Sequence, residues 1–317
     1  MNAEVDQRSA FLEQAAHCDG RSTLYASLCR RFADDERVGA LAERWEQRVP
    51  LQLLAGLHYL VLGGEASWDA VDEALEEHRE FLRRFVAEQP VQTNEVQRSW
   101  TLLPVFLRAV GSCGAVDVVE LGASAGLNLV WDRYRYRYRE GEWGPSDAAL
   151  TLAGEERRPV PAALLREVPR VRSRVGIDRA PVDATTADGA RLLKSFVWAG
   201  QPERLDRLDR AIDAQRVDPP ELVRGDVADA LPRVLERLPS GGVTLVFQTA
   251  VFGYLSEEAR ARVRDVLDAP GRELVFVSSG RPRGDPRAWG VRIHRPARAR
   301  EFVGHADYHG AWLDYDL

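Results

Sequence analysis

The chain has 317 residues, of which 45% are hydrophobic, so it is long enough to bury a sizeable core and to fold on its own. Its 43 basic and 49 acidic residues leave a formal charge of -6, which excludes a global positive field that would attract nucleic acid or anionic membranes. The three cysteines form neither a metal-binding pair nor an even disulfide framework, so we expect a protein of the reducing cytoplasm.

The chain begins with a helical pattern that continues to about residue 110 without any Val- and Ile-rich alternation. Its most apolar stretch, 51–64, contains Gln52 and His58 and is shorter than the roughly 18 residues that a membrane span needs. We therefore expect an α-helical N-terminal region over 1–112 and no membrane partner.

From residue 113 onward, short apolar runs alternate with amphipathic helical stretches, which is typical of a parallel sheet covered by helices. The predicted strands are 116–121, 171–177, 221–226, 243–248 and 273–278. Two further extended pieces, VRIHR and AWLDYDL, have no predicted helix between them, which indicates an antiparallel hairpin at one edge. The sequence therefore predicts an α/β domain over 113–317.

The stretch DRYRYRYRE predicts a β-hairpin inserted around 132–153 that returns through AALTLAG. On a strand, this alternation places Tyr134, Tyr136 and Tyr138 on one face and the arginines on the other. Because no wider basic field surrounds the stretch, we expect the tyrosines to cover the core or the roof of a pocket rather than to stack on nucleic acid bases.

The stretch DVVELGASAGLN places two glycines at the turn after the first predicted strand, where ligands usually bind in an open α/β sheet. A dinucleotide fingerprint would need glycines at 122, 124 and 127, and a P-loop would need a following Gly-Lys-Ser/Thr, so both are poorly supported. The remaining pattern, Glu120-x-Gly122-x-x-x-Gly126, resembles the first motif of class I S-adenosylmethionine-dependent methyltransferases, with Ser124 in place of their middle glycine. The alternative is a glycine turn with nothing bound.

Two later strand ends match the same enzymes. Asp178 ends the second strand, where such enzymes carry an acid that binds both ribose hydroxyls, because a carboxylate offers two acceptor oxygens. Asp226 follows the third, where they commonly hydrogen-bond the adenine amino group, although a solvated turn residue is the alternative for each acid. The resemblance implies the following cofactor-binding set: Glu120, Gly122, Ser124, Gly126, Asn128, Asp178, Asp226 and Val227.

Several longer motifs are similar to those of the domain of unknown function 2332 family across essentially the whole chain. They are VQTNEVQRS, ELGASAGLNLVWDRY, RVGIDRAPVD, FGYLSEEAR and HADYHGAWLDYD. The resemblance implies a Rossmann-like class I methyltransferase sheet, mostly parallel with an antiparallel C-terminal edge, preceded by the α-helical region. It implies no particular substrate.

Methyl transfer needs alignment, exclusion of water and a base for the acceptor proton. We predict that Gln248, Thr249, Tyr254 and His309 lie on the acceptor side, with Asn94, Glu95 and Tyr134 as substrate contacts. Asn94 has a competing interpretation as a helix cap. The fourth strand ends in QTAVFGY and lacks the Asn/Asp-Pro-Pro-aromatic signature of amino-methylating enzymes, so a small-molecule acceptor is favoured over a nucleobase.

The segment GHADYHGAW contains His305, Asp307 and His309, which are ligand types of non-haem iron. Their spacing is cramped for one ion, and a polar turn is the simpler interpretation. The leading hypothesis is therefore an S-adenosylmethionine-dependent methyltransferase with a small-molecule substrate, no nucleic acid partner and no metal. The alternatives are a non-catalytic module that binds an adenosine ligand and a protein partner, or, more weakly, an iron oxygenase. The acceptor and the oligomeric state stay open.

Overall fold

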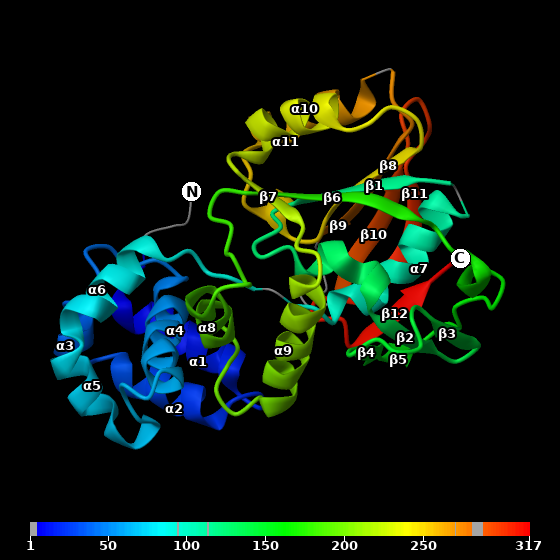
Figure 1. Cartoon of the computed structure of the whole chain (residues 1–317). Helices are drawn as coiled ribbons and strands as arrows, with labels where there is room; N and C mark the ends of the chain where they lie inside the picture. The colour runs from blue at the N-terminus through cyan, green and yellow to red at the C-terminus, as the bar shows by residue number, and fades with distance from the viewer. Residues whose placement is uncertain (1–4, 94, 113, 270, 281–287) are drawn as a thin grey trace. The chain divides into compact units, whose positions relative to one another are not determined.

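The computed structural model, drawn in Figure 1, describes residues 5–93, 95–112, 114–269, 271–280 and 288–317. Its internal contacts divide the chain into two compact units. Unit 1 comprises Met1–Thr93 and Thr186–Asp209, and unit 2 comprises Asn94–Thr185 and Arg210–Leu317. This division differs from the predicted boundary at residue 112, because the helix just before that boundary groups with the sheet and the segment 186–209 groups with the helices.

Unit 1 is helical. Its elements are α1 (Gln7–Cys18), α2 (Thr23–Phe32), α3 (Glu36–Gly39), α4 (Val49–Leu62), η1 (Trp68–Ala70), α5 (Val71–Glu77), α6 (Arg79–Glu88) and α8 (Ala187–Ser195). Helix α4 is the apolar stretch noted in the sequence, and it packs against α1, α6 and α8. No helix within the described ranges is long and apolar enough to cross a membrane.

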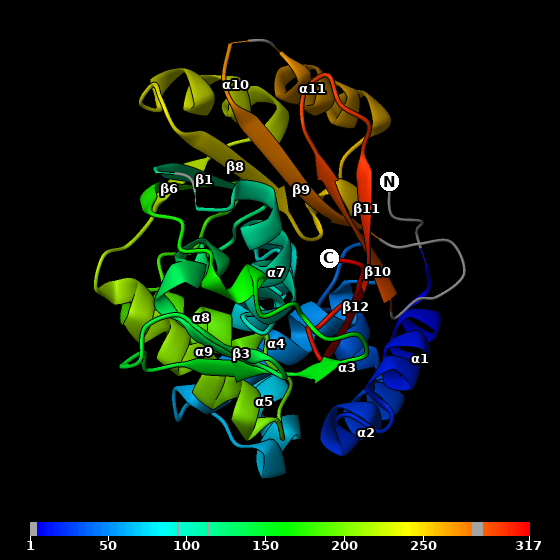
Figure 2. The ribbon, with the colours of Figure 1, turned by 90° about the vertical axis from the view of Figure 1, so that its right-hand side faces the viewer.

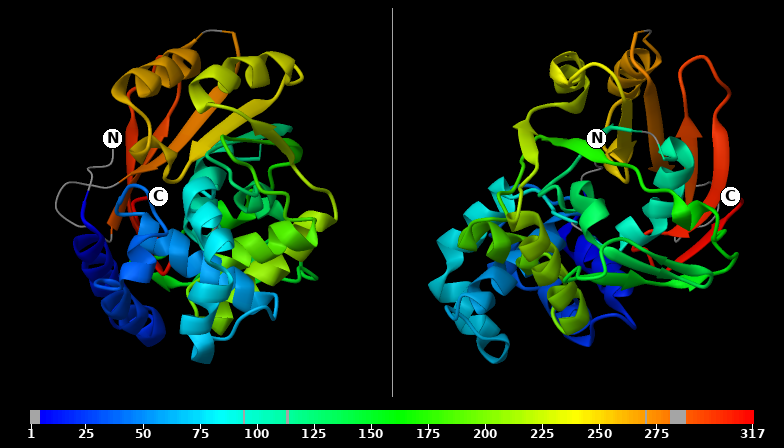
Figure 3. Two further views of the ribbon diagram at one scale, coloured as in Figure 1. Left: turned by 90° about the vertical axis from the view of Figure 1, so that its left-hand side faces the viewer. Right: turned by 45° about the vertical axis from the view of Figure 1, so that its right-hand side comes forward.

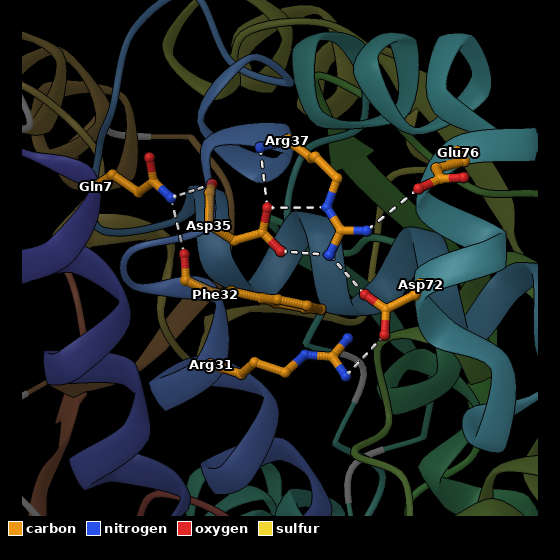
Figure 4. A network of polar contacts seen from close by, with 7 residues as sticks. All are labelled: Gln7, Arg31, Phe32, Asp35, Arg37, Asp72 and Glu76. Carbon is orange, nitrogen blue, oxygen red and sulfur yellow. Dashed lines mark hydrogen bonds and ion pairs between the residues drawn. The ribbon is translucent and has the colours of Figure 1, made fainter.

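An ion-pair network joins the turn between α2 and α3 to α5 within unit 1 (Figure 4). The guanidinium of Arg37 lies 2.8 Å from Asp35 Oδ2 and 2.6 Å from Asp72 Oδ1. That guanidinium also lowers the pKa of the Asp35 carboxyl. Gln7 of α1 donates to the carbonyl oxygens of Phe32 and Asp35. Asp72 and Glu76 are more than half exposed, so their ion pairs with Arg37 add little to stability, whereas Asp35 is mostly buried.

Unit 2 is built on a large mixed sheet that, within the described residues, has the order β5-β12-β11-β10-β9-β8-β1-β6-β7. Its strands are β1 (Val116–Leu121), β5 (Glu155–Glu156), β6 (Val171–Asp178), β7 (Glu221–Arg224), β8 (Val243–Gln248), β9 (Leu274–Gly280), β10 (Ala288–His294), β11 (Glu301–Asp307) and β12 (Trp312–Tyr315). The run from β7 through β6, β1 and β8 to β9 is parallel. The predicted α/β class and the mostly parallel sheet are confirmed. The strand order reverses between β1 and β8, where open α/β sheets bind ligands.

Helices cover both faces of the parallel strands (Figure 1). On one face, α10 (Val227–Arg237) and α11 (Glu257–Asp268) share an apolar core with residues of β1, β6, β8 and β9. On the other, α7 (Arg98–Val110) brings Phe106 to Phe247 of β8, with ring centroids 5.0 Å apart. All of β1 is consequently buried, which is why its sequence reads as a continuous run rather than as an alternation.

The C-terminal edge contains β10, β11 and β12 in an antiparallel arrangement (Figure 2). The sequence predicted an antiparallel edge but only a two-stranded hairpin, and it missed β11. Gly304 lies within that strand and has a φ of +140°. A glycine inside a strand weakens the apolar and β-branched sequence pattern by which the strand would be recognised.

The predicted insertion lies between β1 and β6 and forms a separate three-stranded sheet, seen in green in Figure 3. Its elements are η2 (Leu127–Arg133), β2 (Arg135–Tyr138), β3 (Gly141–Trp143), β4 (Thr151–Ala153) and η3 (Leu164–Arg166). The hairpin partner of β2 is β3, whereas β4 pairs with β2 in parallel, so the predicted return through AALTLAG is wrong. Residues 122–170 are all described and none of them is α-helical, so Gly126 is followed by the 3₁₀ segment η2 and not by the α-helix that usually follows the first strand of an open α/β sheet. Helix α9 (Pro202–Arg216) leads to β7.

Candidate functional site

The glycine turn at the carboxyl end of β1 is closed by a side chain of the protein itself. Gly122 has a φ of +75°, and its N–H donates to the carbonyl oxygen of Ile177 at 2.8 Å. A Cβ at Gly122 would lie 2.6 Å from Cβ of Val251, which is in the 3₁₀ segment η4 (Val251–Gly253). The glycine is therefore required where Val251 packs, and the opening predicted next to it is filled.

The rest of the turn is also fixed by internal contacts. Gly126 has a φ of +74°, and a Cβ there would lie 3.0 Å from the Pro220 side chain. Ser124 has a φ of +52°, the left-handed conformation that the middle glycine of the resembled motif would adopt without strain. Such a conformation costs a non-glycine residue on the order of 1–3 kcal/mol. It is held here because the Ser124 N–H donates to Asp178 Oδ2 at 2.8 Å.

Asp178 and Asp226 end neighbouring strands as predicted, but their oxygens already have partners in the chain. Asp178 Oδ1 accepts from the N–H of Ala180 at 2.9 Å. Asp226 caps α10 through Oδ1, and its Oδ2 lies 2.5 Å from Arg179 Nη2. The bond to Arg179 lowers the pKa of the Asp226 carboxyl. Neither acid is a simply solvated turn residue, and a ligand would have to replace these bonds.

Glu120 is the buried charge of the site, with 2% of the residue exposed. Burial raises the pKa of its carboxyl well above the usual range, and the charge on Asp178 adds to this while Arg98 and a hydrogen bond from Asn128 oppose it. Asn128 is held in turn by Ser99 of α7, whose hydroxyl donates to Asn128 Oδ1 at 2.7 Å. Among the described residues, Glu120 Oε2 has no hydrogen-bond partner.

Arg98, at the start of α7, is a second buried charge near this network. Its guanidinium donates to the carbonyl oxygen of Tyr308 at 2.8 Å and to Thr249 Oγ1 at 3.2 Å. It also lies over the Tyr308 ring, 4.1 Å from the centroid. Arg98 Nη2 is buried without a partner in the described part of the chain. The cavity that Arg98 and Thr249 line measures about 20 Å³, which is room for a single water molecule.

The predicted acceptor-side residues of β8 and the loop after it lie in different surroundings. Both ends of the Gln248 amide are occupied: Nε2 donates to Ser279 O at 2.6 Å, and Oε1 accepts from the Phe252 N–H at 3.3 Å. Gln248 therefore holds the loop in place and does not present a catalytic group. Tyr254 is 76% exposed, away from the buried network.

Two other predicted site residues, Tyr134 and Val227, are buried in the packed interior of the fold. Tyr134 is fully buried, and its hydroxyl donates to the carbonyl oxygen of Leu127 at 2.7 Å, so it secures η2 instead of facing a ligand. Tyr134, Tyr136 and Tyr138 are all buried, the first just before β2 and the other two within it, so they share the inward face that the alternation predicted. Val227 is the first residue of α10 and lies in the core that this helix shares with α11.

The C-terminal histidines do not gather around an ion. Asp307 Oδ1 accepts from the N–H groups of His309 and Ala311, which makes the segment a polar turn. His305 is paired within β11, opposite Gly290 of β10. No group of three or more His, Cys, Asp or Glu side chains in the described ranges is placed to hold a metal.

The structure instead brings His309 to Glu95, two residues that the sequence assigned to separate roles. His309 Nδ1 lies 3.6 Å from Oε2 of Glu95, whose side chain is 4% exposed against 41% for His309. A half-exposed imidazole beside a buried carboxylate is an arrangement that suits proton transfer. Asn94, the third predicted substrate contact, lies outside the described residues.

Comparison with protein families matches residues 8–315 to the family described as "Uncharacterized protein conserved in bacteria (DUF2332)". The chain belongs to this family. The resemblance to the domain of unknown function 2332 family is thereby confirmed, without a reaction being assigned. No curated protein matches the sequence.

Among solved structures, the chain is similar to cofactor-bound Rv0187 from MTB, with 15% sequence identity and a TM-score of 0.21. The similarity covers 68% of this chain and 66% of that one, slightly less than two thirds of its length. A TM-score this low carries no argument about fold or function.

Sequence reasoning missed Arg98 in this DUF2332 protein. In the sequence, Val96, Trp100, Leu103 and Leu107 are spaced four, three and four residues apart, which predicts a helix with one inward face. In the structure α7 is buried almost all round, so Arg98 and Ser99 are also enclosed. The sequence SWTLLPVFL could have indicated this, because it is apolar at nearly every position and leaves no polar face for solvent.

Proposed function

We propose that this protein is an S-adenosylmethionine-dependent methyltransferase that acts on a small molecule, with a sheet of the Rossmann-like class I type. The observation that supports it is the placement of acids at the carboxyl ends of adjacent parallel strands: Glu120 on β1, Asp178 on β6 beside the glycine turn, and Asp226 after β7. Carboxylates at that edge suit a ligand that carries hydroxyl, amino and ammonium donors.

The residues fit such a cofactor in chemical kind. Glu120 keeps a buried oxygen without a partner, which suits an ammonium donor. Asp178 and Asp226 have the acceptor oxygens for a ribose and an adenine amino group, but chain donors occupy them in the described conformation. Val251 would have to leave Gly122 as well. We therefore propose that binding is accompanied by a shift of η4, a short segment whose Gly253 has open space around it.

When bound, the cofactor supplies an electrophilic methyl group on its sulfonium. The chain supplies placement and a base. His309 would take the proton of the acceptor, and the Glu95 carboxylate, 3.6 Å from its Nδ1, would stabilise the imidazolium that forms. Thr249 would keep Arg98 in place. Gln248 would fix the β8 loop through its two backbone contacts.

The test is calorimetric titration of the full chain with S-adenosylmethionine and S-adenosylhomocysteine. We expect both to bind. Glu120→Gln and Asp178→Asn should each weaken binding about tenfold or more. Burial raises the pKa of the Glu120 carboxyl, but an ammonium group at that position would favour its ionised form, which the glutamine variant lacks, and Asp178→Asn removes a charged acceptor. Val251→Ala should strengthen it, because less side chain then covers the turn. Asp147→Asn is the matched control and should bind like the wild type, because Asp147 is exposed and its side chain has no hydrogen bond among the described residues.

Absence of heat with either compound, in both the wild type and Val251→Ala, would rule out the proposed cofactor. A loss of affinity in Asp147→Asn equal to that in Glu120→Gln would instead show that the effect is general and does not come from the site.

A second candidate function is a non-catalytic module that binds an adenosine ligand through the same turn and engages a protein partner. It is favoured by one observation, namely that the polar groups of Gln248 are used internally. Incubation with methyl-labelled S-adenosylmethionine and a small-molecule extract separates the two. Labelled product that disappears in His309→Gln supports the enzyme, whereas cofactor binding without any labelled product supports the module.

A further inference from the structure

We infer that unit 2 has a second ligand site, a cavity that binds a small molecule carrying a phosphate group. The cavity measures about 250 Å³ and lies where α11, β9 and β10 meet, beside Gln248. Its lining contains three arginines, Arg264, Arg292 and Arg300, and no acidic residue among those that the structure describes. The inference rests on this lining and is independent of the proposed cofactor.

Secondary structure determines how the arginines converge. In the β9–β10 pair, Arg292 is opposite Ser278, and His294 is opposite Phe276, so alternate residues of β10 face the cavity. Arg264 and Leu267 are three residues apart on α11 and therefore share a face of that helix. Arg300 comes from the segment just before β11.

The charge of the cavity is uncompensated. None of the three guanidiniums lies within ion-pair distance of a carboxylate in the described part of the chain, although the protein as a whole is acidic, with a formal charge of -6. Arg292 instead lies over the ring of Phe302, 5.1 Å from its centroid. Three cations at one cavity repel one another unless an anion joins them.

A further lining residue, His294, points to the same chemistry. Asp268 holds the Nε2 side of its ring, while Nδ1 is buried without a hydrogen-bond partner in the described ranges. Ser278 and Gly280 add small polar surface at the end of β9. The unused donors that the cavity offers to an oxygen-rich anion are its guanidinium groups, and Nδ1 of His294 joins them only when the ring is an imidazolium.

Three arginines at one cavity favour a ligand with two negative charges, such as a phosphate monoester, over one with a single carboxylate. A phosphate monoester carries close to two negative charges at neutral pH and three acceptor oxygens, and guanidinium forks match its geometry. The floor is apolar, made of Phe252, Leu267 and Phe276, with the two rings 5.6 Å apart. A phosphate ester with an apolar or aromatic portion therefore fits better than inorganic phosphate alone.

The experiment titrates the full chain with phenyl phosphate, inorganic phosphate and benzoate at constant ionic strength, using calorimetry. We expect phenyl phosphate to bind most tightly and benzoate least. The variant with Arg264→Gln, Arg292→Gln and Arg300→Gln should lose on the order of a hundredfold in affinity for phenyl phosphate, because charge-assisted bonds to the anion are removed. The control is Arg233→Gln, an exposed arginine of α10 outside the cavity, which should bind like the wild type.

Equal binding of phenyl phosphate by the wild type and the triple variant overturns the inference, as does its failure to bind the wild type. Tighter binding of a single-stranded oligonucleotide, lost in the triple variant, would also overturn it and assign the arginines to nucleic acid. A wild type that binds phenyl phosphate but not S-adenosylhomocysteine leaves this inference standing and removes the proposed cofactor.

Discussion

The glycine turn at β1 and the arginine-lined cavity beside β9 lie in the same unit but differ in how their polar groups are used. At the turn, Asp178 and Asp226 bond to chain donors, and Val251 fills the space over Gly122. In the cavity, the guanidiniums have no carboxylate partner among the described residues, and about 250 Å³ is open. The turn contains the sequence motif that resembles a cofactor-binding site, whereas the cavity contains arginine side chains whose charge has no counter-ion among the described residues.

This difference separates two kinds of evidence for binding. A motif shows only that certain residue types occur at certain spacings. The same residues can serve the fold instead, as the hydrogen bond from the Ser124 N–H to Asp178 demonstrates. Charged groups without a counter-ion beside an open cavity mark a place where a ligand can bind favourably without any change in the protein's conformation. Mutations at the turn should therefore affect stability as well as any binding there, whereas mutations in the cavity should affect binding with little effect on stability.

The largest expected effect is that of Gly122→Ala. The new Cβ meets Val251 at 2.6 Å while φ stays at +75°, so strain and overpacking should together lower the free energy of unfolding by about 2–4 kcal/mol. Gly253→Ala is the control within η4, where a Cβ meets nothing within 4 Å, and we expect a change within about 0.5 kcal/mol. Urea unfolding of both variants measures the difference.

Combining Gly122→Ala with Val251→Gly sharpens the result. The double variant should be more stable than the sum of the single effects predicts, because removing the Val251 side chain relieves the clash but not the backbone strain. If Gly122→Ala unfolds like the wild type, Val251 does not cover the turn, and the turn is open in the way that the sequence suggested.

A smaller and pH-dependent effect is expected for Glu120→Gln. Burial raises the pKa of Glu120 in the folded state above the value of about 4.3 for an unfolded glutamate. Above that pH the unfolded chain releases a proton that the folded chain retains. The free energy of unfolding of the wild type therefore falls with rising pH, by at most about 1.4 kcal/mol per pH unit, until the folded pKa is passed.

The glutamine variant lacks this dependence, so its stability relative to the wild type should increase between about pH 5 and pH 8 in urea unfolding. Glu142→Gln is the control. Arg135 lowers the pKa of the exposed Glu142, so its contribution is lost only as pH falls through the acidic range. Parallel curves for wild type and Glu120→Gln would mean that Glu120 is not a buried proton-binding group.

Much of the fold could be predicted from the sequence because its parallel strands are local apolar runs bounded by turns. The predicted strand 116–121 matches β1 residue for residue, and 243–248 matches β8. The features that were missed depend on non-local contacts. The helix α7 was expected, but its enclosure on nearly all sides was not. The strand β11 was missed, and it tolerates Gly304 because it lies between β10 and β12.

The sequence predicted which acids, such as Asp178 and Asp226, lie at the carboxyl edge of the sheet. The partners of those residues were not predictable, because they come from distant parts of the chain. Arg179 bonds to Asp226 across 47 positions, and Arg98 bonds to Thr249 across 151. No local pattern encodes such pairs. The meeting of His309 with Glu95 is of the same kind.

The smallest expected effect is that of the cavity arginines on stability without ligand. Arg264→Gln and Arg300→Gln remove exposed cations that have no ion pair in the described structure, so each should change the free energy of unfolding by less than about 0.5 kcal/mol. Arg292→Gln also removes the contact with Phe302, which is worth about 0.5–1 kcal/mol at an exposed site. Thermal unfolding with and without phenyl phosphate measures both properties. At a ligand concentration about 100 times its dissociation constant, the wild type should gain about 2.7 kcal/mol and the triple variant almost nothing. A variant that loses stability without ligand as strongly as Gly122→Ala would show that these arginines serve the fold, and the contrast between the two regions would not hold.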